Sequence, residues 1–132
     1  MIDTQMKELA RYCRIHGYGE PGKTDLPNGG VLVEIPGVSV EGWNRSTADV
    51  LFVAPPSYPA AQPDCFWVQP NGFCLANGGT PQNTNDQSQI PDDVKSGRRT
   101  TWFSWHVQRW NPSRDTLKTY FTVILDRLHP AR

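Results

Sequence analysis

The spacing of apolar positions divides the chain into an N-terminal helix, a middle region of strands and a C-terminal helix. Near the start, apolar residues recur every three or four positions, which predicts a helix over residues 4–16 with Thr4 as its cap. The residues of this apolar stripe are Ile2, Met6, Leu9 and Cys13. Residues 17–30 are rich in glycine and proline and are predicted to form a loop. Cys13 is therefore expected to be a small buried residue of the stripe.

Three extended stretches follow. Residues 31–35 are predicted to form a strand, and Pro36-Gly37 a bend before the extended path resumes. Residues 48–54 are apolar at most positions, which indicates a central strand buried on both faces. A shorter strand is expected at 65–68, before a Pro-Asn-Gly turn. Because the connections are short, the simplest topology is an antiparallel meander.

The last helix has the clearest pattern. Its apolar residues again recur every three or four positions: Leu117, Tyr120, Phe121, Ile124, Leu125 and Leu128. Pro112 and Ser113 are expected to introduce this helix, and Asp115 to favour its positive N-terminal end. One apolar face implies packing against a sheet or another helix. The chain is therefore predicted to be an α+β domain over residues 1–132, an antiparallel meander sheet flanked by an N-terminal and a C-terminal helix.

Two segments before the last helix break the apolar pattern. Residues 76–100 begin with an almost wholly polar run, and we predict a mobile polar loop there. An aromatic cluster follows: Trp102, Phe103, Trp105 and Trp110. With Arg98 and Arg99 nearby, this cluster could stack nucleic-acid bases. Packing around the last helix is the favoured interpretation.

Composition narrows the classes of function. The chain has 13 basic and 13 acidic residues, so no overall field attracts nucleic acid or an anionic membrane. No apolar run approaches the roughly 20 residues that cross a bilayer, and the N-terminus lacks the plan of a signal peptide. Three cysteines without a pairing pattern suit a reducing compartment, so a cytoplasmic location is expected. The histidines and cysteines lack metal-ligand spacing, and neither a metal nor another cofactor is expected.

The candidate chemistry lies in residues 58–75. Prolines keep the start of this stretch out of a sheet ladder, the strand 65–68 follows, and Cys74 comes directly after the turn. Cys74 is the one cysteine expected to be exposed, beside the polar loop. Cys65 falls within the predicted strand, where buried packing is the favoured interpretation.

These motifs together resemble the ubiquitin-conjugating (UBC) family over about residues 31–129. The matching residues are Tyr58-Pro59, Pro63, Pro70-Asn71, Gly72, Cys74-Leu75 and Trp110-Asn111-Pro112, in the order of the family. Two further runs are similar to a bacterial branch: Pro63-Asp64-Cys65-Phe66-Trp67 and Phe103-Ser104-Trp105-His106. Gln69 replaces the family's histidine, and Asn71 lies closer to the cysteine than usual. The insertion between Cys74 and Trp110 is longer than in the eukaryotic enzymes.

The resemblance implies a function and partners. The bacterial branch is associated with operons that encode a ubiquitin-like protein, an activating enzyme and a JAB-type peptidase, and with antiphage defence. By resemblance, the chain is expected to accept a ubiquitin-like protein from the activating enzyme as a thioester on Cys74. It would then pass this protein to a target lysine. The alternative is a catalytically silent UBC-like module that binds one of these partners.

Transfer chemistry suggests further site residues. Aminolysis of a thioester forms a tetrahedral oxyanion that a side-chain amide can stabilise, with Asn71 as the first candidate and Asn77 as the second. The incoming amine must lose a proton, for which His106 or Asp86 could act as a base or a polarising acceptor. A hydrogen-bonded structural role is an equally open interpretation of His106.

Overall fold

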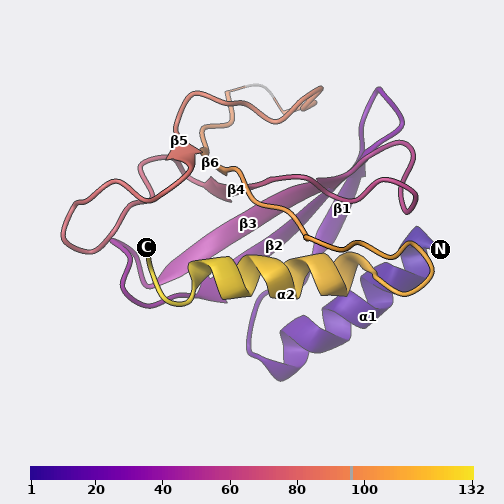
Figure 1. Ribbon diagram of the computed structural model, residues 1–132, viewed down its shortest axis with the longest axis horizontal. Coiled ribbons are helices and arrows are strands. Elements are labelled where there is room, and N and C mark those ends of the chain that lie inside the picture. The colour runs from indigo at the N-terminus through magenta and orange to yellow at the C-terminus, as the bar shows by residue number, and fades with distance from the viewer. Residues whose placement is uncertain (96) are drawn as a thin grey trace.

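The computed structural model describes residues 1–95 and 97–132, in which two helices accompany a six-stranded sheet (Figure 1). The elements in chain order are α1 (Ile2–Ile15), β1 (Gly22–Asp25), β2 (Val31–Ser39), β3 (Thr47–Ala54), β4 (Phe66–Gln69), β5 (Thr84–Asn85), β6 (Thr101–Phe103) and α2 (Leu117–Leu128). The predicted α+β class is confirmed. Residue 96 of the predicted mobile loop 76–100 lies outside the described residues.

The sheet is antiparallel throughout, in the order β1-β2-β3-β4-β6-β5. β2, β3 and β4 form the predicted meander, and β1 adds a strand at its edge, so the prediction of a loop over all of residues 17–30 is wrong. β3 pairs with a strand on each side, as its apolar composition indicated. The predicted bend interrupts β2 as an irregularity between Ile35 and Val38, where Gly37 takes a φ of 66°. The bend therefore changes the register within one strand and does not end it.

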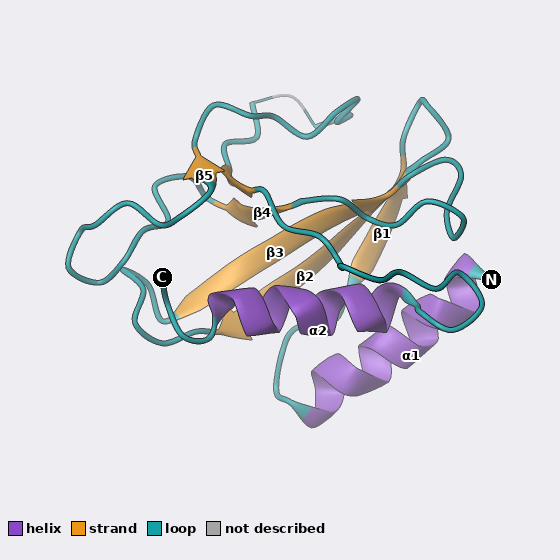
Figure 2. Cartoon of the chain, in the orientation of Figure 1, coloured by secondary structure: helices purple, strands orange, loops and turns teal. Residues whose placement is uncertain are grey.

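The main core lies between the helices and one face of the sheet (Figure 2). Successive side chains of a strand point to opposite faces, and the sheet follows this rule: Val50 and Phe52 face the helices, whereas Leu51 faces away. Leu9 and Cys13 of α1 are fully buried in this core. The prediction for Cys13 is confirmed.

Burial of Cys13 makes stability sensitive to alkaline pH. Burial raises the pKa of this thiol to about 11, whereas a thiol in an unfolded chain has a pKa of about 8.5. The stabilisation is fully present below the unfolded pKa and is lost as pH rises through the folded one, because the unfolded chain releases its proton first. Between pH ~8 and ~10.5, the wild type should lose about 2 kcal/mol more unfolding free energy than Cys13→Ala in urea titrations. Tyr58 and Tyr120 are present in both proteins, so their ionisation lowers both unfolding free energies alike. Equal losses of unfolding free energy in wild type and Cys13→Ala would therefore contradict the prediction.

The second face of the sheet carries a smaller apolar cluster, formed by Leu26, Leu32, Leu51, Trp67 and Ile90. Ile90 comes from the polar segment after Cys74 and is only 5% exposed. In the same segment, the Ser88 carbonyl accepts a hydrogen bond from Trp67 Nε1 at 3.0 Å. The segment that was predicted as a polar loop therefore contributes one strand, β5, and covers part of this face.

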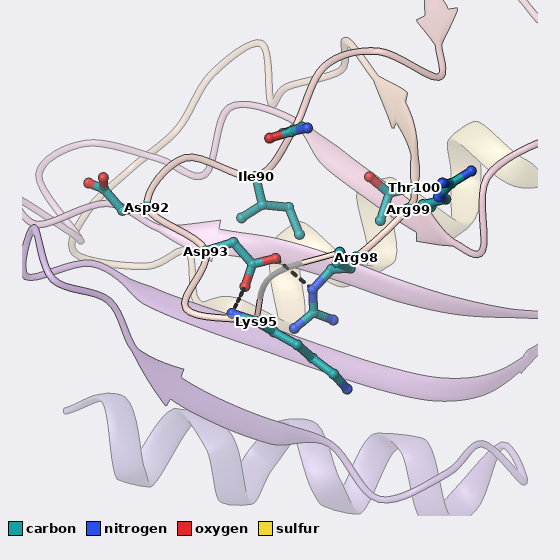
Figure 3. Close-up of a pocket in the computed structure, with 9 residues that line it drawn as sticks. Ile90, Asp92, Asp93, Lys95, Arg98, Arg99 and Thr100 are labelled. Carbon is teal, nitrogen blue, oxygen red and sulfur yellow. Dashed lines mark hydrogen bonds and ion pairs between the residues drawn. The ribbon is translucent and has the colours of Figure 1, made fainter.

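Arg98 attaches the end of this segment to the sheet, and Figure 3 shows its contact with Asp93 inside the segment. Its Nε lies 2.7 Å from Asp93 Oδ2, and its Nη2 lies 3.2 Å from Glu34 Oε1 on β2. Its Nη1 donates to Gln69 Oε1 at 3.0 Å, at the end of β4. The Arg98 side chain is 5% exposed and lines a hollow of about 580 Å³ with Arg99 and others. Arg98 therefore links this segment to β2 and β4, and it is not part of an aromatic platform for nucleic acid.

The helix starts differ from the predictions. α1 begins at Ile2 with Met1 as its N-cap and has no side-chain cap, so the prediction of Thr4 as the cap is wrong. α2 begins at Leu117, because Thr116 and Thr119 form a reciprocal capping box. Asp115 lies just before this helix, and its carboxylate accepts from the Asn111 N–H at 2.8 Å. Asp115 therefore closes the preceding turn.

Candidate active site around Cys74

The turn after β4 places Cys74 at the edge of the core. The chain leaves β4 at Gln69 and turns at Gly72, whose φ of 78° favours glycine. Phe73 then enters the core: it is 1% exposed and stacks on Trp43 with ring centroids 4.4 Å apart. Cys74, the next residue, is half-buried. An anchored aromatic ring thus fixes the residue beside the thiol.

Asn44, from the connection between β2 and β3, holds this turn from one side. Its Oδ1 accepts from the Cys74 N–H at 3.1 Å, and its own N–H donates to the Cys74 carbonyl at 2.8 Å. Its Nδ2 also donates to the Gly72 carbonyl at 2.9 Å. The sequence analysis missed Asn44, because Asn44 lies 30 residues before Cys74 and no local pattern signals such a contact.

Arg45 holds the preceding part of the turn. Its Nη1 donates to the Pro70 carbonyl at 2.8 Å, and its Nη2 donates to the Asn71 carbonyl. The guanidinium carbon lies 5.4 Å from the centroid of the Phe73 ring, within cation–π range. Two neighbouring residues of one connection therefore fix the backbone before and at Cys74.

Asp86 and Thr101 hold the turn from another side. Asp86 Oδ1 accepts from the Gly72 N–H at 3.3 Å and from the Thr101 hydroxyl at 2.6 Å. Thr101 Oγ1 in turn accepts from the Phe73 N–H at 3.1 Å. The structure thus brings the predicted residue Asp86 to the turn that precedes Cys74, where one of its oxygens already has a structural role.

The two predicted amides lie on either side of Cys74 in the chain. Asn71 is exposed on the turn before it. Asn77 is exposed on the turn after it, where its Oδ1 accepts from the Gly79 N–H at 2.8 Å. The Leu75 N–H donates to the Gly79 carbonyl at 3.1 Å and closes this second turn. Both amides are therefore held on short turns adjacent to the cysteine.

His106 is found in a different setting. It is exposed, and its Nδ1 lies 3.9 Å from Asp64 Oδ1. It lines a hollow of about 540 Å³ together with Val123 and Asp126 of α2, a hollow that Cys74 does not line. The contacts of the described residues thus join His106 to Asp64 and not to the turn that carries Cys74.

The other two thiols are poorer nucleophiles. Cys13 is buried, with the raised pKa given above. Burial also raises the pKa of Cys65, an effect that a hydrogen bond with Trp102 partly offsets and the charge of Asp64 reinforces. The thiolate is the reactive form, so both residues are disfavoured at neutral pH. Cys65 lies just before β4 and packs against the smaller apolar cluster, as predicted, but it is only half-buried.

Two classes of site are absent from the described part of the chain. Residues 1–95 and 97–132 contain no group of three or more His, Cys, Asp or Glu side chains able to hold a metal ion. Within the same ranges, no helix has the length and apolar character needed to span a bilayer.

The fold and the turn together define the class of this protein. A four-strand meander, a helix near each end and a cysteine after the turn that follows the fourth strand are the features of a UBC-like protein. The chain matches the profile of the Prokaryotic E2 family E over residues 11–131, and it belongs to this family. Neither a curated protein nor a solved structure matches it. Family membership supports a ubiquitin-conjugating-type role, with ubiquitin-like proteins and activating-type enzymes as the general classes of partner.

Proposed function

We propose that this protein carries a ubiquitin-like protein as a thioester on Cys74 and transfers it to an amine of a protein target. The observation that carries the proposal is the fixed, half-buried placement of Cys74 beside a buried phenylalanine and two exposed amides. Membership of the Prokaryotic E2 family E supports the same chemistry.

The reaction has two exchanges at one carbonyl carbon. In the first, the Cys74 thiolate attacks the thioester that joins the ubiquitin-like protein to the activating enzyme. The new C–S bond forms as the old one breaks, and the enzyme's thiolate leaves. In the second, the target amine attacks the Cys74 thioester, the C–N bond forms, the C–S bond breaks and Cys74 leaves as a thiolate. The amine gives up one proton to a base.

The site residues divide these tasks. Asn71, and after it Asn77, would donate a hydrogen bond to the tetrahedral oxyanion. Asp86 is the better placed of the two proposed proton acceptors, because it contacts the Gly72 N–H on the same turn. His106 lies 3.9 Å from Asp64 and lines a hollow that Cys74 does not line, so it is the second candidate. Gln69, which replaces the family's histidine, is engaged by Arg98 and serves the fold.

Reconstitution tests the proposal. The purified protein is mixed with a ubiquitin-activating-type enzyme, a ubiquitin-like protein and ATP, and the products are separated without reductant. The expected product is a one-to-one adduct that disappears on addition of thiol. A stable complex without a covalent adduct would instead indicate a UBC-like binding module and would reject the carrier function.

A further inference from the structure

The backbone N–H groups of residues 72–76, on both sides of Cys74, are all engaged in hydrogen bonds. The donors and their acceptors are Gly72 to Asp86 Oδ1, Phe73 to Thr101 Oγ1, Cys74 to Asn44 Oδ1, Leu75 to the Gly79 carbonyl and Ala76 to the Gly42 carbonyl. An oxyanion hole made of backbone N–H groups needs free donors at this position. None of these five donors is free, which favours side-chain donors for an oxyanion formed at Cys74.

Asn44 makes the hydrogen bonds that lie closest to the thiol along the backbone. Its amide group spans Phe73: Oδ1 binds the Cys74 N–H, and Nδ2 binds the Gly72 carbonyl. Its backbone N–H binds the Cys74 carbonyl at 2.8 Å. The peptide groups on both sides of the Cys74 α-carbon are therefore tied to this one residue. An isolated antiparallel β-bridge between Trp43 and Leu75 pairs the segment of Asn44 with the segment of Cys74.

We propose that Asn44 is the positioning residue for Cys74. It fixes the backbone that presents the thiol, and by occupying the Cys74 N–H it leaves the oxyanion to side-chain amides. This inference rests on the proposed function, because it assigns Asn44 a part in the acyl transfer at Cys74. Asn44 acts through Cys74 and need not touch the acyl group.

Two substitutions separate the parts of this role. Asn44→Asp keeps an oxygen acceptor for the Cys74 N–H but places a negative charge within hydrogen-bond distance of the Cys74 backbone and opposite the Gly72 carbonyl. Asn44→Ala removes the side-chain acceptor without adding charge. The matched controls are Asn28→Asp and Asn28→Ala, since Asn28 likewise accepts from a backbone N–H, that of Gly30 at 2.8 Å, at a distant turn. All variants carry Cys65→Ala, so that iodoacetamide reports on Cys74 and not on the half-buried Cys65.

Alkylation by iodoacetamide as a function of pH is the first readout. Asn44→Asp should slow alkylation at neutral pH by about tenfold and move the pH–rate profile to higher pH, because a nearby carboxylate disfavours the thiolate. Asn28→Asp should leave the profile unchanged. A merely structural effect would change the melting temperature without this displacement. An Asn44→Asp profile that coincides with wild type would overturn the proposal.

Hydrogen exchange is the second readout. In Asn44→Ala the Cys74 amide should exchange at least about tenfold faster, while the Ala76 amide, bonded to the Gly42 carbonyl, keeps its rate. In Asn44→Asp the Cys74 amide should remain protected, and this variant keeps the test valid if the alanine variant fails to fold. Unchanged protection in Asn44→Ala would overturn the positioning role.

Adduct formation completes the test. In the reconstituted system Asn44→Ala should form the thioester about tenfold more slowly than wild type, because a misplaced nucleophile loses rate steeply. The Asn28→Ala control should keep the wild-type rate. If wild type itself forms no adduct, the proposed function fails, and alkylation and exchange still decide separately whether Asn44 positions Cys74. An Asn44→Ala rate equal to wild type would reject Asn44 as a positioning residue for transfer.

Discussion

Replacing Cys74 by alanine is expected to abolish the thiol-sensitive adduct, with at least about a hundredfold loss of product on non-reducing gels. Of the three cysteines, Cys74 is the half-buried one whose backbone N–H and carbonyl are both fixed by Asn44. Cys13 is fully buried, and burial raises the pKa of Cys65. Cys74→Ser should give a slower-forming oxygen ester that survives reductant, since an oxygen ester does not exchange with added thiol.

The matched control for this prediction is Cys65→Ala. Cys65 is half-buried and lies near the start of β4, whereas Cys74 follows its end, so loss of the Cys65 thiol should leave charging within about twofold of wild type. The reverse pattern, with charging kept in Cys74→Ala and lost in Cys65→Ala, would move the acceptor to the other thiol. Charging kept in both variants would remove cysteine from the mechanism.

Arg127→Ala is expected to cost about 3–5 kcal/mol of unfolding free energy. Arg127 is 1% exposed, and its guanidinium lies between 5.0 and 6.0 Å from the ring centroids of Trp43, Phe103 and Trp105. Its Nη2 donates to the Gln82 carbonyl at 2.8 Å. Removal leaves a cavity among the aromatic rings and frees the loop that follows Cys74. Urea denaturation measures the loss.

Arg127→Met separates packing from charge. Burial lowers the pKa of Arg127 to about 10, and the nearby charge of Arg132 adds to this effect. The charged form of Arg127 is therefore destabilised in the folded protein. Its Nη1 is also buried without a hydrogen-bond partner among the described residues. A methionine that refills the space should therefore lose less than half as much stability as alanine. An equal loss in the two variants would show that the hydrogen bonds and charge of Arg127, and not its volume, stabilise this region.

The elements predicted from sequence are those with a strong local pattern. The apolar stripe of α2 and the apolar run of β3 each bury their own residues, so their periodicity alone reveals them. β1 is an edge strand of sequence Gly-Lys-Thr-Asp with no apolar alternation, and β5 has two residues. Such strands form because a neighbour offers hydrogen bonds, which a local pattern cannot show. The start of α2 was placed too early because Thr116, not Ser113, provides the cap.

The residues of the candidate site likewise include some that a local sequence pattern reveals and some that it cannot reveal. Cys74 and its turn were identified from a contiguous motif and its order relative to Trp110. Asn44 could not be found, because its role consists of hydrogen bonds to a segment 30 residues away. Arg127 left a signal that was overlooked: it falls three residues after Ile124 and seven after Tyr120, on the buried stripe of α2. A basic residue on an apolar stripe indicates a buried partner.

The most direct test of Cys74 as the acyl carrier is tandem mass spectrometry of the charged protein, prepared without reductant and digested under mildly acidic conditions. We expect one ubiquitin-like protein per chain, with a mass gain equal to that protein less one water, and fragments that assign its C-terminal remnant to residue 74. A remnant on Cys65 or on a lysine, or a fully active pathway that leaves the chain unmodified, would contradict the account.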